Sequence, residues 1–126
     1  MASNNNLKST ADFLGKIISF RNSLKLVHWS ITGKGSYEAH ISLDQAIESL
    51  SGITDRLVET TIAVVGSVEI IIPETARPTD HIKHIGDFYA YVEKTREIFT
   101  ETFSQSIIDE FQEAVQQLLF RLKRLV

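Results

Sequence analysis

Apolar residues recur at every third or fourth position in four long stretches of this chain, and this spacing is typical of helices that bury one face. The stretches cover about residues 8–31, 36–65, 80–99 and 106–126. The sequence therefore predicts an all-α fold. The side chains expected to face the core are Phe13, Ile17, Phe20, Leu24, Val27, Leu43, Ile47, Leu50, Leu57, Val64, Ile82, Ile85, Phe88 or Tyr89, Val92, Phe99, Phe111, Val115, Leu118, Leu122 and Leu125.

Residues with known preferences for helix ends lie between these stretches. Gly33 suits the left-handed conformation that ends many helices, and Ser36 is a suitable N-cap for the second stretch. Ser106 and Asp109 resemble a capping box, in which two side chains satisfy the free N–H groups of a first helical turn. We therefore expect the fourth helix to begin at Ser106.

The segment GSVEIIIPETARP, residues 66–78, interrupts the helical pattern with Gly66, Pro73 and Pro78. Its VEIII run has the composition of a strand, but a lone strand would have no partner. We therefore expect an extended connection whose isoleucines pack against the helices.

Four helices with one long link, between the second and the third, predict a four-helix bundle with one crossover. This connectivity is found in ferritin-like folds. The length of 126 residues fits a single domain over residues 1–126, in which we expect residues 1–7 to form a disordered tail.

The composition excludes several classes of function. The formal net charge is -3 and the pI is near 5.8, so we expect no nucleic-acid partner. The absence of cysteine excludes disulfides, zinc–thiolate sites and thiol nucleophiles. The N-terminus lacks the pattern of a secretory signal, and the most apolar run is shorter than the roughly 20 residues of a membrane helix. We expect a soluble, cytoplasmic protein without a membrane partner.

Five residues with metal-binding side chains lie between positions 28 and 59, namely His28, His40, Asp44, Asp55 and Glu59. At about 100° per residue, the last four share one face of the second helix, and the core leucines lie on another. A solvated surface is the simple explanation for any one of these residues. The ordered pattern, which contains two of the chain's four histidines, favours a metal site.

The length of the second helix makes a site within one chain impossible. Asp44 and Asp55 lie about 16 Å apart along the axis, whereas ligands lie about 2 Å from a bound metal. Two copies of this helix, packed antiparallel about a two-fold axis, can bring both groups to one ion. His28, His40 and Asp44 of one chain would then face Asp55 and Glu59 of the other, twice in each dimer.

The spacing H-W-x3-G, H-x3-D and D-x3-E resembles that of the Dps-like ferritins, also called DNA-binding proteins from starved cells. The close resemblance covers about residues 10–66. It implies a ferritin-like fold and a ferroxidase centre shared between two subunits. The residues that match are His28, Trp29, Gly33, His40, Asp44, Asp55 and Glu59.

The resemblance also implies an activity and an assembly. Dps-like ferritins oxidise iron(II) with hydrogen peroxide or dioxygen and store the ferric mineral in a cage of twelve subunits. We therefore expect an iron-storing oxidoreductase with one or two iron ions in each site, for which zinc could substitute. Trp29 would lie near the metal and intercept radicals, or simply anchor the end of its helix.

Other interpretations remain open. A structural or adaptor protein, in a virus particle or another large assembly, could use a ferritin-like dimer as a building block, and the link between the second and third helices is short for a Dps-like protein. A structural zinc site would also suit histidine and aspartate ligands. His81 and His84 could bind a surface ion, although solvated side chains are the simpler explanation.

Overall fold

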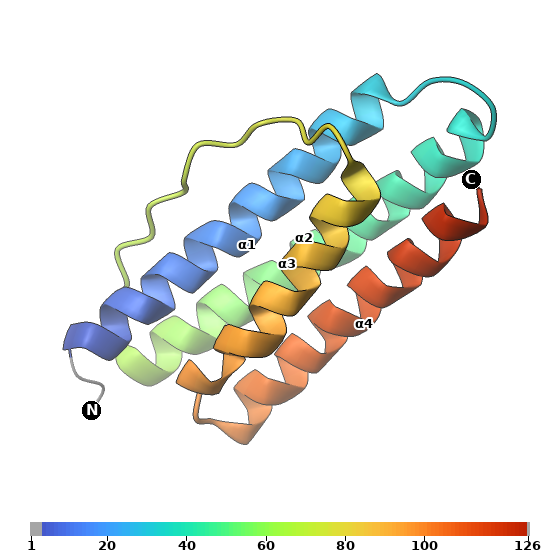
Figure 1. Ribbon diagram of the computed structural model, residues 1–126. Coiled ribbons are helices and arrows are strands. Elements are labelled where there is room, and N and C mark those ends of the chain that lie inside the picture. Colours follow the sequence, from blue (N-terminus) through green and yellow to red (C-terminus); the bar gives the residue numbers. More distant parts are fainter. Residues whose placement is uncertain (1–3, 126) are drawn as a thin grey trace.

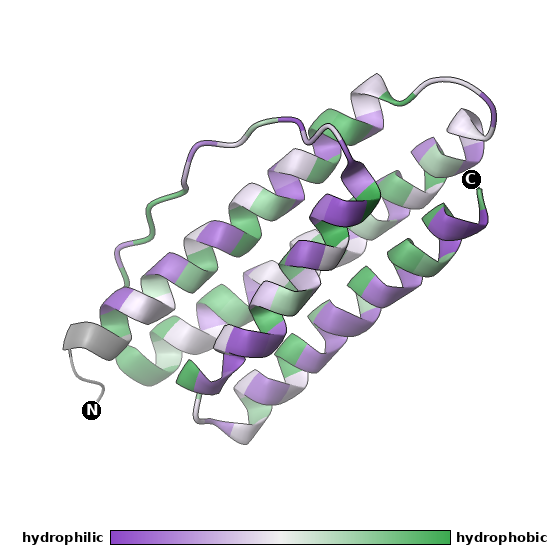
Figure 2. Cartoon of the chain, viewed as in Figure 1, coloured by the Kyte–Doolittle hydropathy of each residue, from purple (hydrophilic) through white to green (hydrophobic). Residues whose placement is uncertain are grey.

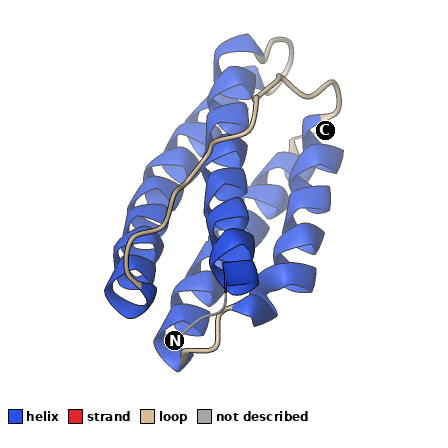
Figure 3. Cartoon of the chain, turned by 90° about the vertical axis from the view of Figure 1, so that its left-hand side faces the viewer, coloured by secondary structure: helices blue, strands red, loops and turns tan. Residues whose placement is uncertain are grey.

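A computed structural model describes the backbone of residues 4–125 and the side chains of residues 7–125. It contains the helices α1 (Asn4–Ser30), α2 (Ser36–Val65), α3 (His81–Thr95) and α4 (Thr102–Arg124), with a short 3-10 helix, η1 (Arg96–Ile98), after α3. The described residues contain no strand (Figure 3). The predicted all-α class and the four-helix bundle are confirmed.

Helix α1 begins at Asn4, rather than near residue 8 as expected. Of the tail expected over residues 1–7, residues 1–3 lie outside the described part of the chain. Among the described residues, no helix has the length and apolar character needed to cross a membrane.

Each helix packs against two neighbours in the bundle (Figure 1). Helix α2 contacts α1 and α4, and α3 contacts α4 and α1. The pairs α1–α2 and α3–α4 are antiparallel, whereas α2 and α3 run in the same direction. The link between α2 and α3, which we call the crossover (residues 66–80), therefore returns along the length of the bundle beside α1.

The apolar stripes of the four helices meet in the interior (Figure 2). Val64 was predicted to face the core, but it is 44% exposed because it lies in the last turn of α2, where the chain leaves for the crossover. The other predicted core positions are buried or packed against the core. The fully buried ones include Phe13, Ile17, Leu24, Leu43, Leu50, Leu57, Ile85, Val92, Val115, Leu118 and Leu122.

The ends of the helices confirm one prediction and correct another. Gly33 has the expected positive φ, of 91°. The N-cap of α2 is Gly35, also at positive φ, and Ser36 is the first residue of the helix instead of its cap. The side chain of Asp80 caps α3 by accepting a hydrogen bond from the backbone N–H of Lys83, at 3.0 Å.

The predicted capping box at Ser106 is wrong because α4 begins one turn earlier, at Thr102. The Ser106 hydroxyl donates to the carbonyl of Thr102, and Asp109 accepts a hydrogen bond from Arg96 at 2.6 Å. Arg96 also donates to the side chains of Gln105 and Gln112. Arg96 therefore links η1 to α4 through three side chains. Asp109 is one of these three, and it accepts from Arg96 instead of capping a helix.

The isoleucines of the crossover pack only in part as expected. Val68 and Ile70 lie against the core, but Ile71 and Ile72 are exposed. In an extended chain, neighbouring side chains point to opposite sides, which accounts for the packing of Val68 and Ile70 and the exposure of Ile71. Alternation does not account for the exposure of Ile72, which is 48%.

The crossover touches α1 most closely at Gly15. A Cβ atom at this position would lie 2.2 Å from the backbone oxygen of Ile71, so only glycine allows the approach. One turn further along α1, the hydroxyls of Ser19 and Thr75 form a hydrogen bond of 2.7 Å. These two contacts hold the crossover on α1.

We predict that Gly15→Ala destabilises the protein, although alanine is the better helix former by about 1 kcal/mol. The new methyl group would push the crossover off α1. Gly86→Ala is the matched control, since an added Cβ in that helix has no atom within 4 Å. Thermal unfolding should show a higher midpoint for Gly86→Ala, by about 4 °C, and a lower one for Gly15→Ala. Stabilisation by both variants would contradict the close contact.

Candidate metal centre

The turn between α1 and α2 brings two histidine rings together. His28 lies in the last turn of α1, and His40 lies in the second turn of α2. Their ring centroids are 3.8 Å apart, with an angle of 24° between the planes. Five residues between the two helices are enough to place these rings side by side.

The hydrogen bond of His40 indicates which of its nitrogens is free. Its Nδ1 lies 3.1 Å from the backbone carbonyl oxygen of His28. A carbonyl can only accept, so Nδ1 carries the proton and Nε2 keeps a lone pair in the neutral ring. A backbone carbonyl that holds the far nitrogen of an imidazole is a common arrangement for metal-ligating histidines.

His28 is a buried imidazole without hydrogen-bond partners. The residue is 7% exposed, and neither ring nitrogen has a hydrogen bond in the described part of the chain. Burial lowers the pKa of His28, and the neighbouring His40 and Lys25 lower it further, against a smaller opposite effect of Asp44. The ring is therefore neutral at neutral pH. A buried polar group without a partner costs free energy, which points to a role other than stability.

Asp44 lies beside the two rings and faces a lysine that the sequence analysis did not single out. Its carboxylate is 3.6 Å from Nε2 of His28, too long for a hydrogen bond, and 3.9 Å from Nζ of Lys25. Lys25 stands one helical turn before His28, and this spacing is the signal that could have identified it. In the single chain, Lys25 supplies the positive charge that faces Asp44.

Asp55 and Glu59 form a separate acidic pair further along α2. The hydrogen bond to Asp55, together with the charge of that carboxylate, raises the pKa of Glu59. The pair lies about 16 Å from Asp44 along the helix, at the rise of 1.5 Å per residue. Within the described residues, no three histidine, aspartate or glutamate side chains converge as a metal site. The structure therefore keeps the candidate ligands in two separate groups, which we call half-sites: His28, His40 and Asp44 near one end of α2, and Asp55 and Glu59 near the other.

Exposed apolar side chains lie near both half-sites. Trp29 at the end of α1 is 68% exposed and Tyr37 is 71% exposed; Ile41 and Ile62 on α2 are also exposed. The ring of Trp29 lies 5.4 Å from Nζ of Lys25. Because most of Trp29 faces outward, it does not anchor the helix end within a single chain.

The other two histidines, His81 and His84, lie in different surroundings on α3. His81 lines a shallow pocket beside Gly35 and Leu125. Nε2 of His84 lies 2.7 Å from the hydroxyl of Ser23, and its ring stacks on Phe20. The prediction of a solvated side chain is therefore wrong for His84, because α3 turns this residue toward α1.

The described residues form an all-helical four-helix bundle, in which the candidate ligands lie in two separate groups. The chain belongs to a protein family of unknown function (DUF5856), which it matches over residues 28–122. No curated protein and no solved structure matches the chain.

We predict that metal-free His28→Leu is at least as stable as the natural protein, because leucine leaves no buried nitrogen without a partner. His84→Leu is the control and should lose about 1 kcal/mol, since it breaks the hydrogen bond to Ser23. Urea unfolding at pH 7.5 measures both changes. Added zinc(II) should raise the stability of the natural protein and leave that of His28→Leu unchanged. A large loss of stability in metal-free His28→Leu would show that the imidazole is a structural core residue.

Proposed function

We propose that two copies of this chain form a dimer that oxidises iron(II) at two shared sites, as Dps-like ferritins do. The observation that carries the proposal is the buried, neutral and unpaired imidazole of His28 beside His40 and Asp44. In the dimer, Asp55 and Glu59 of the partner complete each site. Iron(II) is the substrate, and two imidazoles with carboxylates are ligands that suit it.

The positions on α2 support an antiparallel pairing about a two-fold axis. His40 and Glu59 lie at equal distances from the point between Ser49 and Leu50, and so do Asp44 and Asp55. In a helix pair that crosses at this point, each histidine half-site meets the acidic half-site of the other chain.

Two exposed apolar residues of α2 are also spaced symmetrically about the point between Ser49 and Leu50. Tyr37 and Ile62 lie at equal distances from that point, on the face that carries the acidic residues. Each Tyr37 would therefore pack on Ile62 of the partner at an end of the interface. Exposed apolar groups that pair with each other under a two-fold axis are typical of isologous dimers.

The groups of the two half-sites fit a divalent cation. His28 is neutral, and Nε2 of His40 keeps its lone pair. The hydrogen bond to Asp55 and, after it, the charge of that carboxylate raise the pKa of Glu59, and a bound cation would offset this charge. The overall reaction balances as two iron(II) ions and one hydrogen peroxide, with two protons, giving two iron(III) ions and two waters. Assembly of the dimers into a cage would add storage of the ferric product.

A second candidate function is that of a structural or adaptor protein built on the same dimer. Two observations favour it: the rings of His28 and His40 stack instead of converging on one point, and Ile71 and Ile72 are exposed on the crossover. In this case the shared sites would hold zinc or no metal. Iron(II) titration in the absence of oxygen, followed by peroxide, separates the two functions.

The shared site can be tested with two inactive variants. Asp44→Ala damages one half-site and Glu59→Gln the other, so each homodimer should show almost no iron(II) oxidation. When the two are refolded together in equal amounts, about half of the dimers are mixed, and each mixed dimer has one intact site. About a quarter of the natural activity should therefore return, measured by the absorbance of ferric iron after peroxide is added. A mixture that stays inactive, with mixed dimers confirmed by mass, would refute the shared site.

The register of the dimer can be tested by introducing a charge at one end of the interface and an opposite charge at the position that should face it. Ile62→Glu should weaken the dimer about tenfold, because it loses an apolar contact and adds a charge to an acidic face. Tyr37→Lys on the same chain should restore much of the affinity, since each lysine faces the partner's new glutamate. The control for this rescue is Gln117→Lys on an exposed face of α4. Equal rescue by both lysines, measured by analytical ultracentrifugation, would rule out the proposed register.

A further inference from the structure

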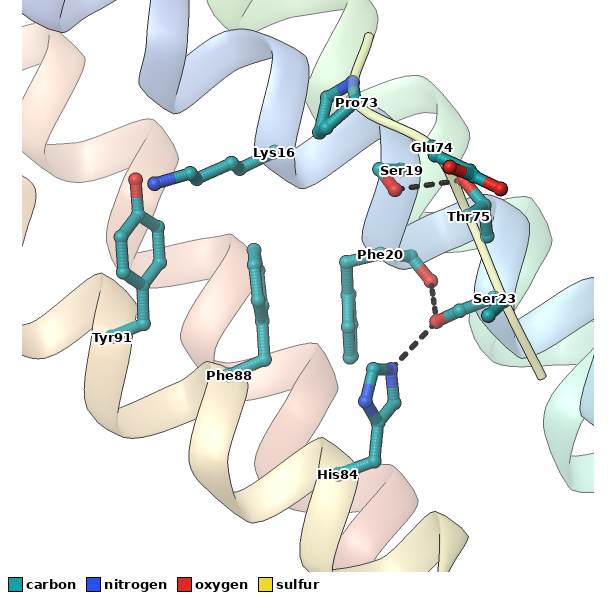
Figure 4. Close-up of a pocket in the computed structure, with 11 residues that line it drawn as sticks. Lys16, Ser19, Phe20, Ser23, Pro73, Glu74, Thr75, His84, Phe88 and Tyr91 are labelled. Carbon is teal, nitrogen blue, oxygen red and sulfur yellow. Dashed lines mark hydrogen bonds between the residues drawn. The ribbon is translucent and has the colours of Figure 1, made fainter. Parts of the chain in front are cut away.

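A pocket of about 320 Å³ lies under the crossover, between α1 and α3 (Figure 4). Ser19, Phe20 and Ser23 line it from α1, and His84, Phe88 and Tyr91 line it from α3. Residues 73–76 of the crossover close one side. The pocket faces α3, whereas the half-sites of the metal centre lie along α2, so the proposed iron chemistry does not use it.

Aromatic side chains form much of the pocket wall. The rings of Phe20 and Phe88 are nearly parallel, with centroids 4.2 Å apart and an angle of 5° (Figure 4). The ring of Tyr91 lies 5.3 Å from that of Phe88. The stacked faces of Phe20 and Phe88 cover each other, and Phe20 is only 2% exposed. The aromatic surface left for a ligand is that of Phe88 and Tyr91, and it favours an aromatic ring, which gains both burial and stacking.

The hydrogen bonds of Ser23 determine the tautomer of His84. The Ser23 hydroxyl donates its only proton to the carbonyl of Phe20, at 2.5 Å, because a carbonyl can only accept. Nε2 of His84, at 2.7 Å, must therefore donate to the Ser23 oxygen. This leaves Nδ1 with a lone pair and, among the described residues, without a hydrogen-bond partner. Burial lowers the pKa of His84, against a smaller opposite effect of Asp87, so the ring stays neutral at neutral pH.

The other polar groups of the pocket do not call for an ionic ligand. Nζ of Lys16 is paired with Asp12 at 3.1 Å, and the hydroxyls of Ser19 and Thr75 bond to each other. Glu74 is exposed to solvent. In the neutral ring, Nδ1 of His84 can only accept, so a ligand with an N–H or O–H donor would satisfy it.

We propose that this pocket binds a small, uncharged aromatic molecule that carries an N–H or O–H donor. Its ring packs against Phe88 and Tyr91, and its donor bonds to Nδ1 of His84. The crossover, held on α1 by the contact at Gly15 and the hydrogen bond between Ser19 and Thr75, covers the bound ring.

Two probes of almost the same shape test the proposal. Indole has an N–H donor, and benzofuran has an acceptor oxygen in its place. Each is titrated into the full-length ¹⁵N-labelled protein at pH 7.5, and the shifts of amide resonances are followed. We expect saturable binding of indole, with shifts at Ser19, Ser23 and Phe88, and binding of benzofuran about fivefold to tenfold weaker, since it leaves Nδ1 without a donor.

The variant His84→Phe removes the acceptor and keeps an aromatic ring next to Phe20. In this variant indole should bind no more tightly than benzofuran. Equal affinity of the two probes for the natural protein would overturn the role of Nδ1, and this comparison does not depend on the folding of any variant. Absence of saturable indole binding, or shifts confined to residues outside the pocket, would overturn the pocket itself.

Discussion

The contact between Gly15 and the crossover determines how the bundle is closed. Because α2 and α3 run in the same direction, their link must travel the length of the molecule, and it can lie against α1 only where no side chain intervenes. The crossover then covers the α1–α3 side of the bundle. The face of α2 that carries Asp44, Asp55 and Glu59 remains open. Because Gly15 has no side chain, the crossover can lie on α1, where it covers the pocket between α1 and α3 and leaves the acidic face of α2 exposed.

Each of the two candidate sites contains a histidine, but the hydrogen bonding of the two side chains differs. His84 is partly buried, bonded to Ser23 and stacked on Phe20, and its surroundings leave one defined acceptor. His28 is more deeply buried and has no hydrogen bond, and a second imidazole lies against it. A core selected only for stability would not retain such a group, since burial of an unpaired nitrogen costs free energy. A partner chain and a cation would supply what His28 lacks.

The exposed residues of α2 give the proposed dimer its physical basis. In a single chain, Tyr37 and Ile62 expose apolar surface and the pair Asp55–Glu59 gathers negative charge. In the proposed dimer, antiparallel pairing would bury the apolar ends, and bound cations would offset the charge between them. The family match over residues 28–122 includes all five residues of the two half-sites.

The four helices, most of the core and the candidate ligands can be predicted from the sequence, because helical periodicity and residue spacing are local properties. Local patterns gave a wrong prediction where a residue outside the pattern forms the contact. Arg96 donates a hydrogen bond to Asp109, and α4 begins at Thr102, so the expected cap at Ser106 does not form. Three features became visible only in the folded chain: His28 has no hydrogen bond, Lys25 faces Asp44, and His84 bonds to Ser23. Each of these depends on the packing of one helix against another. The spacing within α1 places Lys25 beside His28, but it does not determine that the lysine faces Asp44 on α2.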